Sequence, residues 1–437
     1  MAGHRVAVAM SGGVDSSVAC LLLGKAGYDV VGLTMKLLSD GAVDVSESHR
    51  GGATPCCTAD AARDAAAVCH RLGVPHYTVN LVEEFETGVI DPFVRDYATA
   101  RTPNPCLLCN KVMKFGHLLH KAREIGARYV ATGHYVRAAR MIKDGAWVEN
   151  HAFARDEGQS TADVPEVISL TAYLLRGVDK NKDQSYALYG LTQEMLRHSM
   201  FPLGGLTKSD VREIAHEAGL ATAERKESQE ICFVTGDGYR EFLERRGVVG
   251  KPGNIEDTSG RIVGKHVGLP FYTVGQRRGV GAQAGRAVYV VSLDVKRNAV
   301  VVGSREEAFS RGCVIERLNF PSAGSLDAPV SGTCMVRYRG TEVEAVMRPI
   351  PKDGNEEASD RDGNAADLGG VLHEAEGARA GVCEIAGVGE EVYDVRNAKK
   401  RAVVEFERPL FAVAPGQALV FYQGDIVYGG GIISKSM

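Results

Sequence analysis

The chain has 437 residues, of which 44% are hydrophobic and 24% are charged, and its formal net charge is −4. This length allows two or three domains with cores of their own. No run approaches the roughly 20 apolar residues of a membrane span, so we expect a cytosolic protein. The acidic balance excludes a uniformly basic surface for nucleic acid, and ten cysteines spread over so long a chain do not favour a disulfide framework.

Short β-branched runs alternate with helix-length segments from residue 5 to about residue 134. This alternation predicts a doubly wound, mostly parallel α/β sheet with helices on both faces, whose ligands bind at the carboxyl ends of the strands. Thr207 and Asp210 have the spacing of a capping box that begins a helix reaching Gly219. The other strands are expected at 5–10, 30–35, 76–81 and 129–134, and the other helices at 15–25, 58–72 and 111–125.

The pattern changes after about residue 238, where Gly-punctuated β runs replace the helical periodicity. Short strands between turn signals predict one or two small β-domains. The stretch near 352–378 is acidic and poor in large apolar residues, so we expect a disordered, solvated insertion there.

The heptad SGGVDSS, residues 11–17, follows the first predicted strand. Gly12 and Gly13 allow positive φ and close approach to a ligand, and the helix that follows offers N–H groups to an anion. The loop lacks the lysine of the G-x-x-x-x-G-K-[ST] phosphate loop, so it predicts a phosphate cradle of another kind. The alternative is a Gly-rich turn with no ligand.

Three cysteines have surroundings that suit reactive thiols. Cys106 and Cys109 form a C-x-x-C pair before a helix that we expect to start near Asn110, and a helix N-terminus with Lys111 nearby favours a thiolate. Cys232 lies where the α/β region ends. A structural zinc needs four ligands, and a thioredoxin-like pair does not suit a domain that carries the predicted phosphate cradle, whereas a three-cysteine [4Fe–4S] site stays open.

The remaining cysteines are expected to be structural. Core packing suits Cys20 and Cys69 on predicted helices, and Cys313, Cys334 and Cys383 in or beside the β region. Cys56 and Cys57 have no interpretation from the sequence.

A series of motifs extends from about residue 5 to residue 433. In order, the motifs are MSGGVDSS, RTPNPCLLCNKVMKF, ATGHY, DKNKDQSYALYGL, ESQEICFV, PGNI, GQRRG, APGQALVFY and GGGII. Their order and spacing resemble the bacterial tRNA-specific 2-thiouridylases of the ATP-pyrophosphatase superfamily. The resemblance implies an adenine nucleotide alpha hydrolase-like catalytic domain at 1–235, a central β-rich tRNA-contacting domain at 236–303, and a C-terminal β-barrel at 304–437.

The resemblance also implies an activity, a sulfur transfer to the wobble uridine, position 34, of tRNAs for Lys, Glu and Gln. ATP would adenylate the C2 oxygen, with Asp15 helping to hold Mg²⁺. Cys109 would be the nucleophile and Cys232 would carry a persulfide, and the two thiols would be left as a disulfide. The implied ATP-binding residues are Ala9, Met10, Ser11, Gly12, Gly13, Val14, Asp15, Ser16, Met35 and Gly133.

The implied partners are the anticodon stem-loop of tRNA and a persulfide donor or sulfur-carrier protein, without a membrane. A target base in the anticodon loop must be splayed out to reach a buried site. Positions that match target-base or tRNA contacts of the family are Asn104, Pro105, Cys106, His134, Lys182, Asp183, Gln184, Arg337, Tyr338 and Gln417.

Cys106 departs from the pattern of the family, in which many members carry Asp at this position. A thiol cannot replace Asp as a general base in the same way. Related thiolation enzymes with three cysteines hold an iron–sulfur cluster, so a [4Fe–4S] cluster on Cys106, Cys109 and Cys232 is the alternative cofactor. Two further hypotheses are an ATP-pyrophosphatase ligase with an amine acceptor and a non-catalytic tRNA-binding module.

Overall fold

The computed structural model describes residues 4–39, 59–141, 147–149, 171–225, 231–234, 238–280, 287–322, 324–351 and 400–437. The expected acidic insertion near 352–378, and Cys56, Cys57 and Cys383, lie outside these residues. Within them, no helix is long and apolar enough to cross a membrane.

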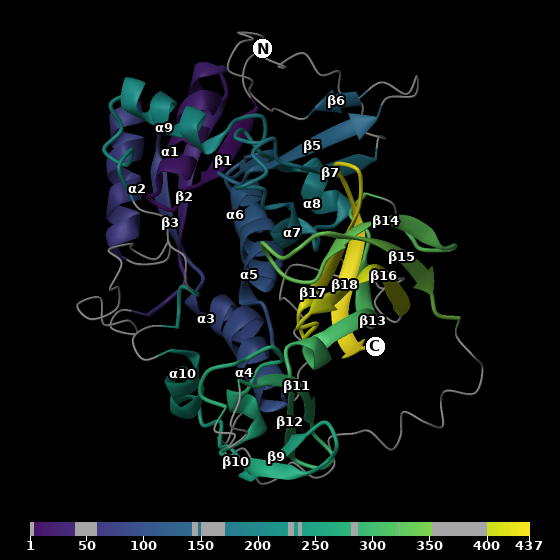
Figure 1. Cartoon of the computed structure of the whole chain (residues 1–437). Helices are drawn as coiled ribbons and strands as arrows, with labels where there is room; N and C mark the ends of the chain where they lie inside the picture. The colour runs from purple at the N-terminus through teal and green to yellow at the C-terminus, as the bar shows by residue number, and fades with distance from the viewer. Residues whose placement is uncertain are drawn as a thin grey trace.

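The N-terminal part is a parallel sheet in the order β3-β2-β1-β4-β8 with helices on both faces, as predicted (Figure 1). Val6 and Val8 of β1 pack toward α1 and α2, whereas Ala7, between them, packs toward α6. This alternation follows from the two-residue period of a strand. The strands are β1 (Arg5–Ala9), β2 (Asp29–Lys36), β3 (His76–Asn80), β4 (Tyr129–Ala131) and β8 (Ser199–Met200), and the helices are α1 (Val14–Lys25), α2 (Ala59–Leu72), α6 (Leu118–Glu124) and α9 (Lys208–Glu217).

A series of short helices connects β3 to α6. Two of its segments are π-helices, a wide form that occurs frequently at functional sites. The series consists of α3 (Val82–Phe85), π-helix η1 (Glu86–Ile90), α4 (Asp91–Ala98), α5 (Pro105–Leu108) and π-helix η2 (Cys109–His117).

The central part is a four-stranded sheet in the order β10-β9-β12-β11, preceded by α10 (Tyr239–Arg245). Its apolar residues share one core cluster with α3, η1 and α4 of the N-terminal part. The strands are β9 (Gly253–Asp257), β10 (Ile262–His266), β11 (Tyr289–Asp294) and β12 (Ala299–Gly303), with short 3-10 helices η3 (Leu269–Phe271) and η4 (Glu306–Ala308).

The C-terminal part is a closed barrel, in which β13 pairs with both β16 and β18. The sheet continues beyond the barrel, because β18 also pairs with β7 of the N-terminal part, and β7 pairs with β5. The barrel strands are β13 (Phe309–Asn319), β14 (Val330–Met335), β15 (Val343–Pro349), β16 (Ala402–Phe411), β17 (Ala418–Gln423) and β18 (Ile426–Ser436), and the extension is β7 (Ala172–Arg176), β5 (Val136–Met141) and β6 (Trp147–Glu149).

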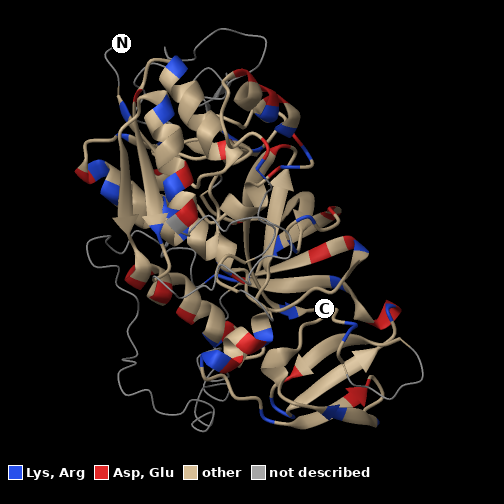
Figure 2. Cartoon of the chain, turned by 90° about the vertical axis from the view of Figure 1, so that its left-hand side faces the viewer, with Lys and Arg blue, Asp and Glu red and all other residues tan. Residues whose placement is uncertain are grey.

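Lys and Arg residues are interspersed with Asp and Glu over the ribbon in Figure 2. This mixed distribution agrees with the net charge of −4. A binding surface for an anion must therefore be built locally from a few cations rather than from the field of the whole protein.

Candidate active site

The Ser11–Ser17 loop joins β1 to α1 at the carboxyl edge of the sheet, where the strand order reverses between β1 and β4. The hydroxyls of Ser16 and Ser17 donate to the Gly13 carbonyl at 3.1 and 2.8 Å, which fixes the loop on the first turn of the helix. Gly13 is the N-cap and has no side chain to cap α1. The helix N-terminus is therefore presented to an anion at the position where a parallel sheet binds its ligand.

Two glycines of this site are fixed by close backbone approach. Gly12 has φ +70°, and a Cβ there would lie 2.5 Å from the Ala61 carbonyl oxygen of α2. A Cβ on Gly133, just after β4, would lie 2.7 Å from the carbonyl carbon of Asp15. The expected ATP residues of the loop and Gly133 are therefore brought together.

Two cations reach the loop from distant parts of the sequence. The Lys208 ammonium, on the first residue of α9, donates to Asp15 Oδ1 at 2.7 Å, and the Tyr135 hydroxyl donates to the same oxygen at 2.7 Å. The Arg225 guanidinium donates to the Gly12 carbonyl at 2.7 Å and also contacts Asp64. These residues supply the positive charge that the loop itself lacks. Neither contact was predicted, because 193 and 213 positions separate the partners in the sequence.

The helix carrying the C-x-x-C pair begins earlier than predicted. The Asn104 side chain accepts a hydrogen bond from the Cys106 backbone N–H at 3.2 Å, so Asn104 is the N-cap and Pro105 is the first helical residue. The predicted start near Asn110 is wrong, because an Asn-Pro pair is itself a helix-start signal. The dipole therefore acts most directly on Cys106, in the first turn, and Cys109 instead opens the π-helix η2.

Cys109 and Cys232 both pack against one buried core cluster, although 123 positions separate them in the numbering. Phe233 anchors the second cysteine, since its ring lies 5.7 Å from Phe85 and 5.2 Å from Phe93. Met35, near the carboxyl end of β2, borders the same cluster. Cys109 and Cys232 are partly buried, whereas Cys106 is exposed.

A buried polar network connects the end of β4 to η2. Lys114 Nζ donates to Asn110 Oδ1 at 2.8 Å and lies 3.4 Å from His134 Nε2, while His134 Nδ1 lies 2.7 Å from Thr132 Oγ1. Burial, and secondarily Lys114, hold the pKa of His134 well below its ordinary value. His134 is therefore favoured as a neutral imidazole, and both of its ring nitrogens lie within hydrogen-bonding distance of protein groups.

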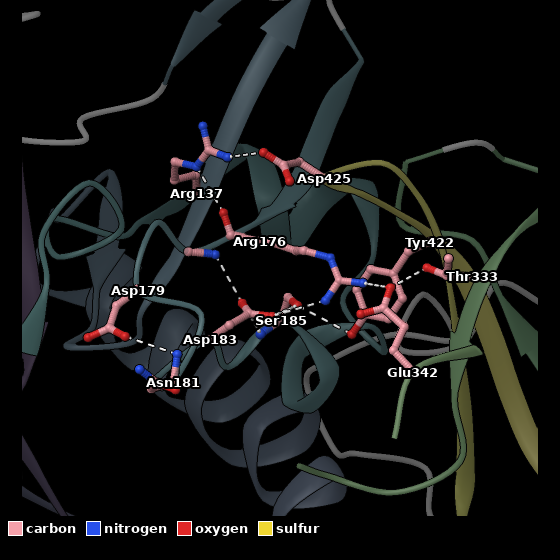
Figure 3. A network of polar contacts seen from close by, with 11 residues as sticks. Arg137, Arg176, Asp179, Asn181, Asp183, Ser185, Thr333, Glu342, Tyr422 and Asp425 are labelled. Carbon is pink, nitrogen blue, oxygen red and sulfur yellow. Dashed lines mark hydrogen bonds and ion pairs between the residues drawn. The ribbon is translucent and has the colours of Figure 1, made fainter. Parts of the chain in front are cut away.

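The expected tRNA-contacting stretch at 182–184 follows β7 and is held by its own side chains (Figure 3). Asp183 Oδ1 accepts from the backbone N–H groups of Gly177 and Ser185 at 2.9 and 3.1 Å. Gln184 Oε1 accepts from the Tyr135 N–H at 2.9 Å. Asp183 and Gln184 thus shape the loop, and Lys182 is partly exposed on it.

The barrel contacts the segment that precedes the cysteine helix. Gln417 Nε2 donates to the Thr102 carbonyl at 3.0 Å, and the Thr102 N–H donates to the Pro415 carbonyl at 2.8 Å. Arg337 is exposed on the β14–β15 hairpin, and Tyr338, beside it, is 38% exposed. Gln417 therefore positions the segment before Asn104, whereas Arg337 and Tyr338 are available to a ligand.

The cysteines expected to be structural are buried. Cys20, Cys69, Cys313 and Cys334 are each 0% exposed, as predicted. Burial raises the pKa of the Cys334 thiol to about 12, so this thiol is not a nucleophile near neutral pH. Within the described ranges, no group of three or more His, Cys, Asp or Glu side chains is arranged to hold a metal ion.

Comparison with known proteins identifies the same three parts. Family models for a tRNA methyl transferase HUP domain, a tRNA methyl transferase PRC-barrel domain and an aminomethyltransferase β-barrel domain match residues 4–236, 240–304 and 391–433. A predicted tRNA methyltransferase subunit from Methanocaldococcus jannaschii, of known structure, is 18% identical. The match covers 49% of this chain and 76% of that chain, with a TM-score of 0.26.

Curated relatives are similar over the full length. A tRNA-specific 2-thiouridylase of Moorella thermoacetica is 41% identical, covering 98% of this chain and 99% of the relative. The protein of that name from Heliobacterium modesticaldum is 40% identical over 99% of this chain and 93% of the relative. One from Carboxydothermus hydrogenoformans is 40% identical over 99% and 98%.

Proposed function

Because this chain belongs to the tRNA-specific 2-thiouridylase family, we propose that it catalyses the ATP-dependent 2-thiolation of the wobble uridine, position 34, in tRNAs for Lys, Glu and Gln. It is a sulfur-transferring enzyme, and we place it in the cytoplasm with its tRNA substrate. Full-length similarity of about 40% to proteins of that name supports the reaction. One structural observation carries the proposal. Cys109 and Cys232 pack against the same buried cluster, and Met35 at the sheet edge also borders this cluster.

The first step uses ATP to activate the base. The uridine C2 oxygen attacks the α-phosphorus of ATP and pyrophosphate leaves, which converts the oxygen into part of a good leaving group, AMP. The Ser11–Ser17 loop and the N-terminus of α1 are suited to hold the phosphates. Lys208 and Arg225 lie where they can neutralise negative charge that develops on the leaving pyrophosphate.

The second step supplies sulfur. Cys232 carries a persulfide. In one route its terminal sulfur attacks C2 directly, and the Cys109 thiolate then attacks the Cys232 sulfur and breaks the sulfur–sulfur bond to the base, which releases 2-thiouridine. In the other route the Cys109 thiolate attacks the Cys232 sulfur first and releases hydrosulfide, which then attacks C2. In both routes AMP leaves with the former uridine oxygen, and Cys109 and Cys232 end as a disulfide. A thiol reductant reopens that disulfide, and an external persulfide donor, directly or through a sulfur-carrier protein, reloads Cys232.

Mg²⁺ fits this site through Asp15, because Mg²⁺ is usually bound by one or two carboxylates together with substrate phosphates. When bound, Mg²⁺ would neutralise phosphate charge. A [4Fe–4S] cluster does not fit the arrangement described, since Cys106 is exposed while Cys109 and Cys232 are partly buried, and the described residues form no metal-holding group. We therefore derive no step through a cluster.

For tRNA, we propose a surface formed by the N-terminal part and the barrel. Asn104, Pro105 and Cys106 would lie against the target base, Lys182 and Arg337 would contact phosphates, and Tyr338 would stack on a base. His134, Asp183, Gln184 and Gln417 would shape this surface from beneath, given their internal hydrogen bonds. The domain bounds 1–235, 236–303 and 304–437 remain part of the proposal.

The test uses the purified full chain with unmodified tRNA for Lys, MgATP, and a cysteine desulfurase with cysteine as persulfide source. Nucleoside mass spectrometry measures 2-thiouridine, and a coupled assay measures pyrophosphate. We expect product from the wild type, and product at background level from the Cys109→Ser and Cys232→Ser variants. Cys106→Ser, three residues from Cys109, is the comparison variant. It removes the thiol but keeps a side chain of similar size at the proposed base contact, so it should retain most of the activity.

Other outcomes identify the other hypotheses. Thiolation by Cys109→Ser would contradict the proposed chemistry, and pyrophosphate release that needs an amine instead of sulfur would indicate a ligase. Binding of tRNA without pyrophosphate release would indicate a binding module. Loss of activity in Cys106→Ser, together with iron and labile sulfide in anaerobically purified protein, would favour the cluster.

A further inference from the structure

Two loops proposed to face tRNA come from parts of the chain that are more than 150 residues apart: the 182–184 loop after β7 and the tip of the β14–β15 hairpin, with Arg337 and Tyr338. Arg176, the last residue of β7, lies between them (Figure 3). Its side chain is 18% exposed. A buried guanidinium at such a junction can fix one loop relative to the other.

On the N-terminal side, Arg176 reaches the residue that organises the first loop. Arg176 Nη1 lies 3.7 Å from Asp183 Oδ2, and the same carboxylate oxygen accepts from the Ser185 hydroxyl at 2.7 Å. Since Asp183 also binds the backbone of Gly177 and Ser185, any shift of Arg176 is transmitted to the entire turn.

On the barrel side, Arg176 contacts the base of the hairpin. Its guanidinium carbon lies 3.6 Å from the centre of the Tyr422 ring, and Arg176 Nη2 pairs with Glu342. Glu342 also accepts from the Thr333 hydroxyl on the opposite strand, so these two residues enclose the tip that carries Arg337 and Tyr338. The planar guanidinium stacks and pairs simultaneously, which a lysine ammonium cannot do.

We propose that Arg176 is a positioning residue that holds the 182–184 loop and the 337–338 hairpin tip in register, so that both contact one tRNA. This inference rests on the proposed function. Arg176 itself does not touch RNA in this arrangement, because its charged group is turned toward Asp183, Glu342 and Tyr422. It acts through the two loops.

The same interface provides a matched control. Arg137 of β5 pairs with Asp425 at 2.7 Å and donates from Nε to the Arg176 carbonyl at 2.8 Å. Its side chain is 17% exposed, similar to that of Arg176, and both Asp425 and the Arg176 carbonyl lie outside the two RNA-facing loops. Arg137→Met removes a comparable cation at the same interface but leaves the contacts of the Arg176 side chain with Asp183, Glu342 and Tyr422 in place.

The experiment measures the dissociation constant of tRNA for Lys by fluorescence anisotropy at several salt concentrations. Each phosphate contact adds about one unit to the slope of log affinity against log salt concentration. We expect Arg176→Met to weaken binding roughly tenfold at every salt concentration with the wild-type slope, while Arg337→Gln lowers the slope by about one. Arg137→Met should stay within about threefold of the wild type, and the affinity for ATP should not change in any variant.

Several outcomes would overturn the inference. A reduced salt slope in Arg176→Met would make Arg176 a direct phosphate contact. Equal losses of tRNA affinity in Arg176→Met and Arg137→Met would indicate that both residues only stabilise the interface. Unchanged tRNA affinity in Arg176→Met would show that Arg176 has no role in binding. Arg176→Lys, which keeps the charge and is expected to fold, should still bind more weakly than the wild type. Failure of the wild-type protein to bind tRNA would instead refute the proposed function.

Discussion

At the scale of single residues, the candidate active site depends on positions where no side chain fits. A methyl group on Gly133 would lie 2.7 Å from the Asp15 carbonyl carbon and 2.9 Å from the Ser16 nitrogen, both backbone atoms that cannot rotate away. We expect Gly133→Ala to lower the free energy of unfolding by about 1–3 kcal/mol and to weaken ATP binding, because the loop must move.

Gly24, in the helix α1 whose first turn Gly133 approaches, is the control for this substitution. A Cβ at Gly24 would meet nothing within 4 Å, so Gly24→Ala should raise the free energy of unfolding by up to about 1 kcal/mol. Urea unfolding and ATP titration calorimetry measure both effects. Equal affinities for ATP in Gly133→Ala and the wild type would contradict the assigned site.

His134 gives a prediction for pH. Because burial holds the pKa of folded His134 well below 6.5, the folded protein keeps the imidazole neutral where the unfolded chain takes up a proton. The stability from this neutral group is therefore complete above about pH 6.5 and is lost as the pH falls, at about 1.4 kcal/mol per pH unit. Urea unfolding between pH 7.5 and 5 should show a shallower loss in His134→Gln.

The corresponding control is His70→Gln, because His70 is exposed on α2. This variant should retain the wild-type dependence of the free energy of unfolding on pH. A wild-type slope in His134→Gln would mean that His134 is not the neutral, buried group described.

At the scale of elements, α9 has a second task besides packing, since its first residue, Lys208, reaches Asp15. Thr207 and Asp210 form the predicted capping box that fixes this end of the helix. Thr207→Ala should cost about 1 kcal/mol of stability and also raise the dissociation constant of ATP, because Lys208 loses its fixed position. Thermal unfolding and calorimetry measure the two quantities.

Thr192→Ala separates the loss of a cap from the loss of the site. The Thr192 side chain caps α8 (Gln193–Arg197) by accepting from the Met195 N–H at 3.2 Å, a contact that does not involve the Ser11–Ser17 loop. Thr192→Ala should lose about as much stability as Thr207→Ala, but its affinity for ATP should equal that of the wild type. If both variants bind ATP equally well, the link between α9 and the loop is wrong.

Elements with local signals were predictable from the sequence, and those set by distant contacts were not. The period of β1 and the capping box at Thr207 are local, and both were placed correctly. The start of the cysteine helix differs from the prediction because Asn104 and Pro105 themselves begin the helix. The π-helix η2 and the approach of Lys208 and Arg225 to the loop depend on tertiary packing, which residue spacing does not encode.

At the scale of the whole molecule, the barrel forms one sheet with β7, β5 and β6 of the N-terminal part through the pairing of β18 with β7, whereas the parallel sheet is separate. The sequence indicated β runs in the barrel. It did not indicate that Gln417 contacts the segment before the cysteine helix, or that Arg176 of β7 contacts the β14–β15 hairpin. Such contacts connect residues 315 and 166 positions apart, respectively. The barrel is therefore part of the proposed site rather than a separate RNA-binding attachment.

The docking of the barrel on the segment before the cysteine helix gives the last prediction. Gly416 has φ +93°, and a Cβ there would lie 2.6 Å from the Thr102 nitrogen across the interface. Gly424, in the β17–β18 turn, has φ +57° and meets nothing within 4 Å. Both Ala substitutions incur a local backbone cost of about 1–2 kcal/mol, but only Gly416→Ala displaces residues 102–104. We expect Gly416→Ala alone to reduce 2-thiouridine formation and to increase proteolytic cleavage near residue 102. Equal thiolation rates in the two variants would show that barrel docking does not position the cysteine helix.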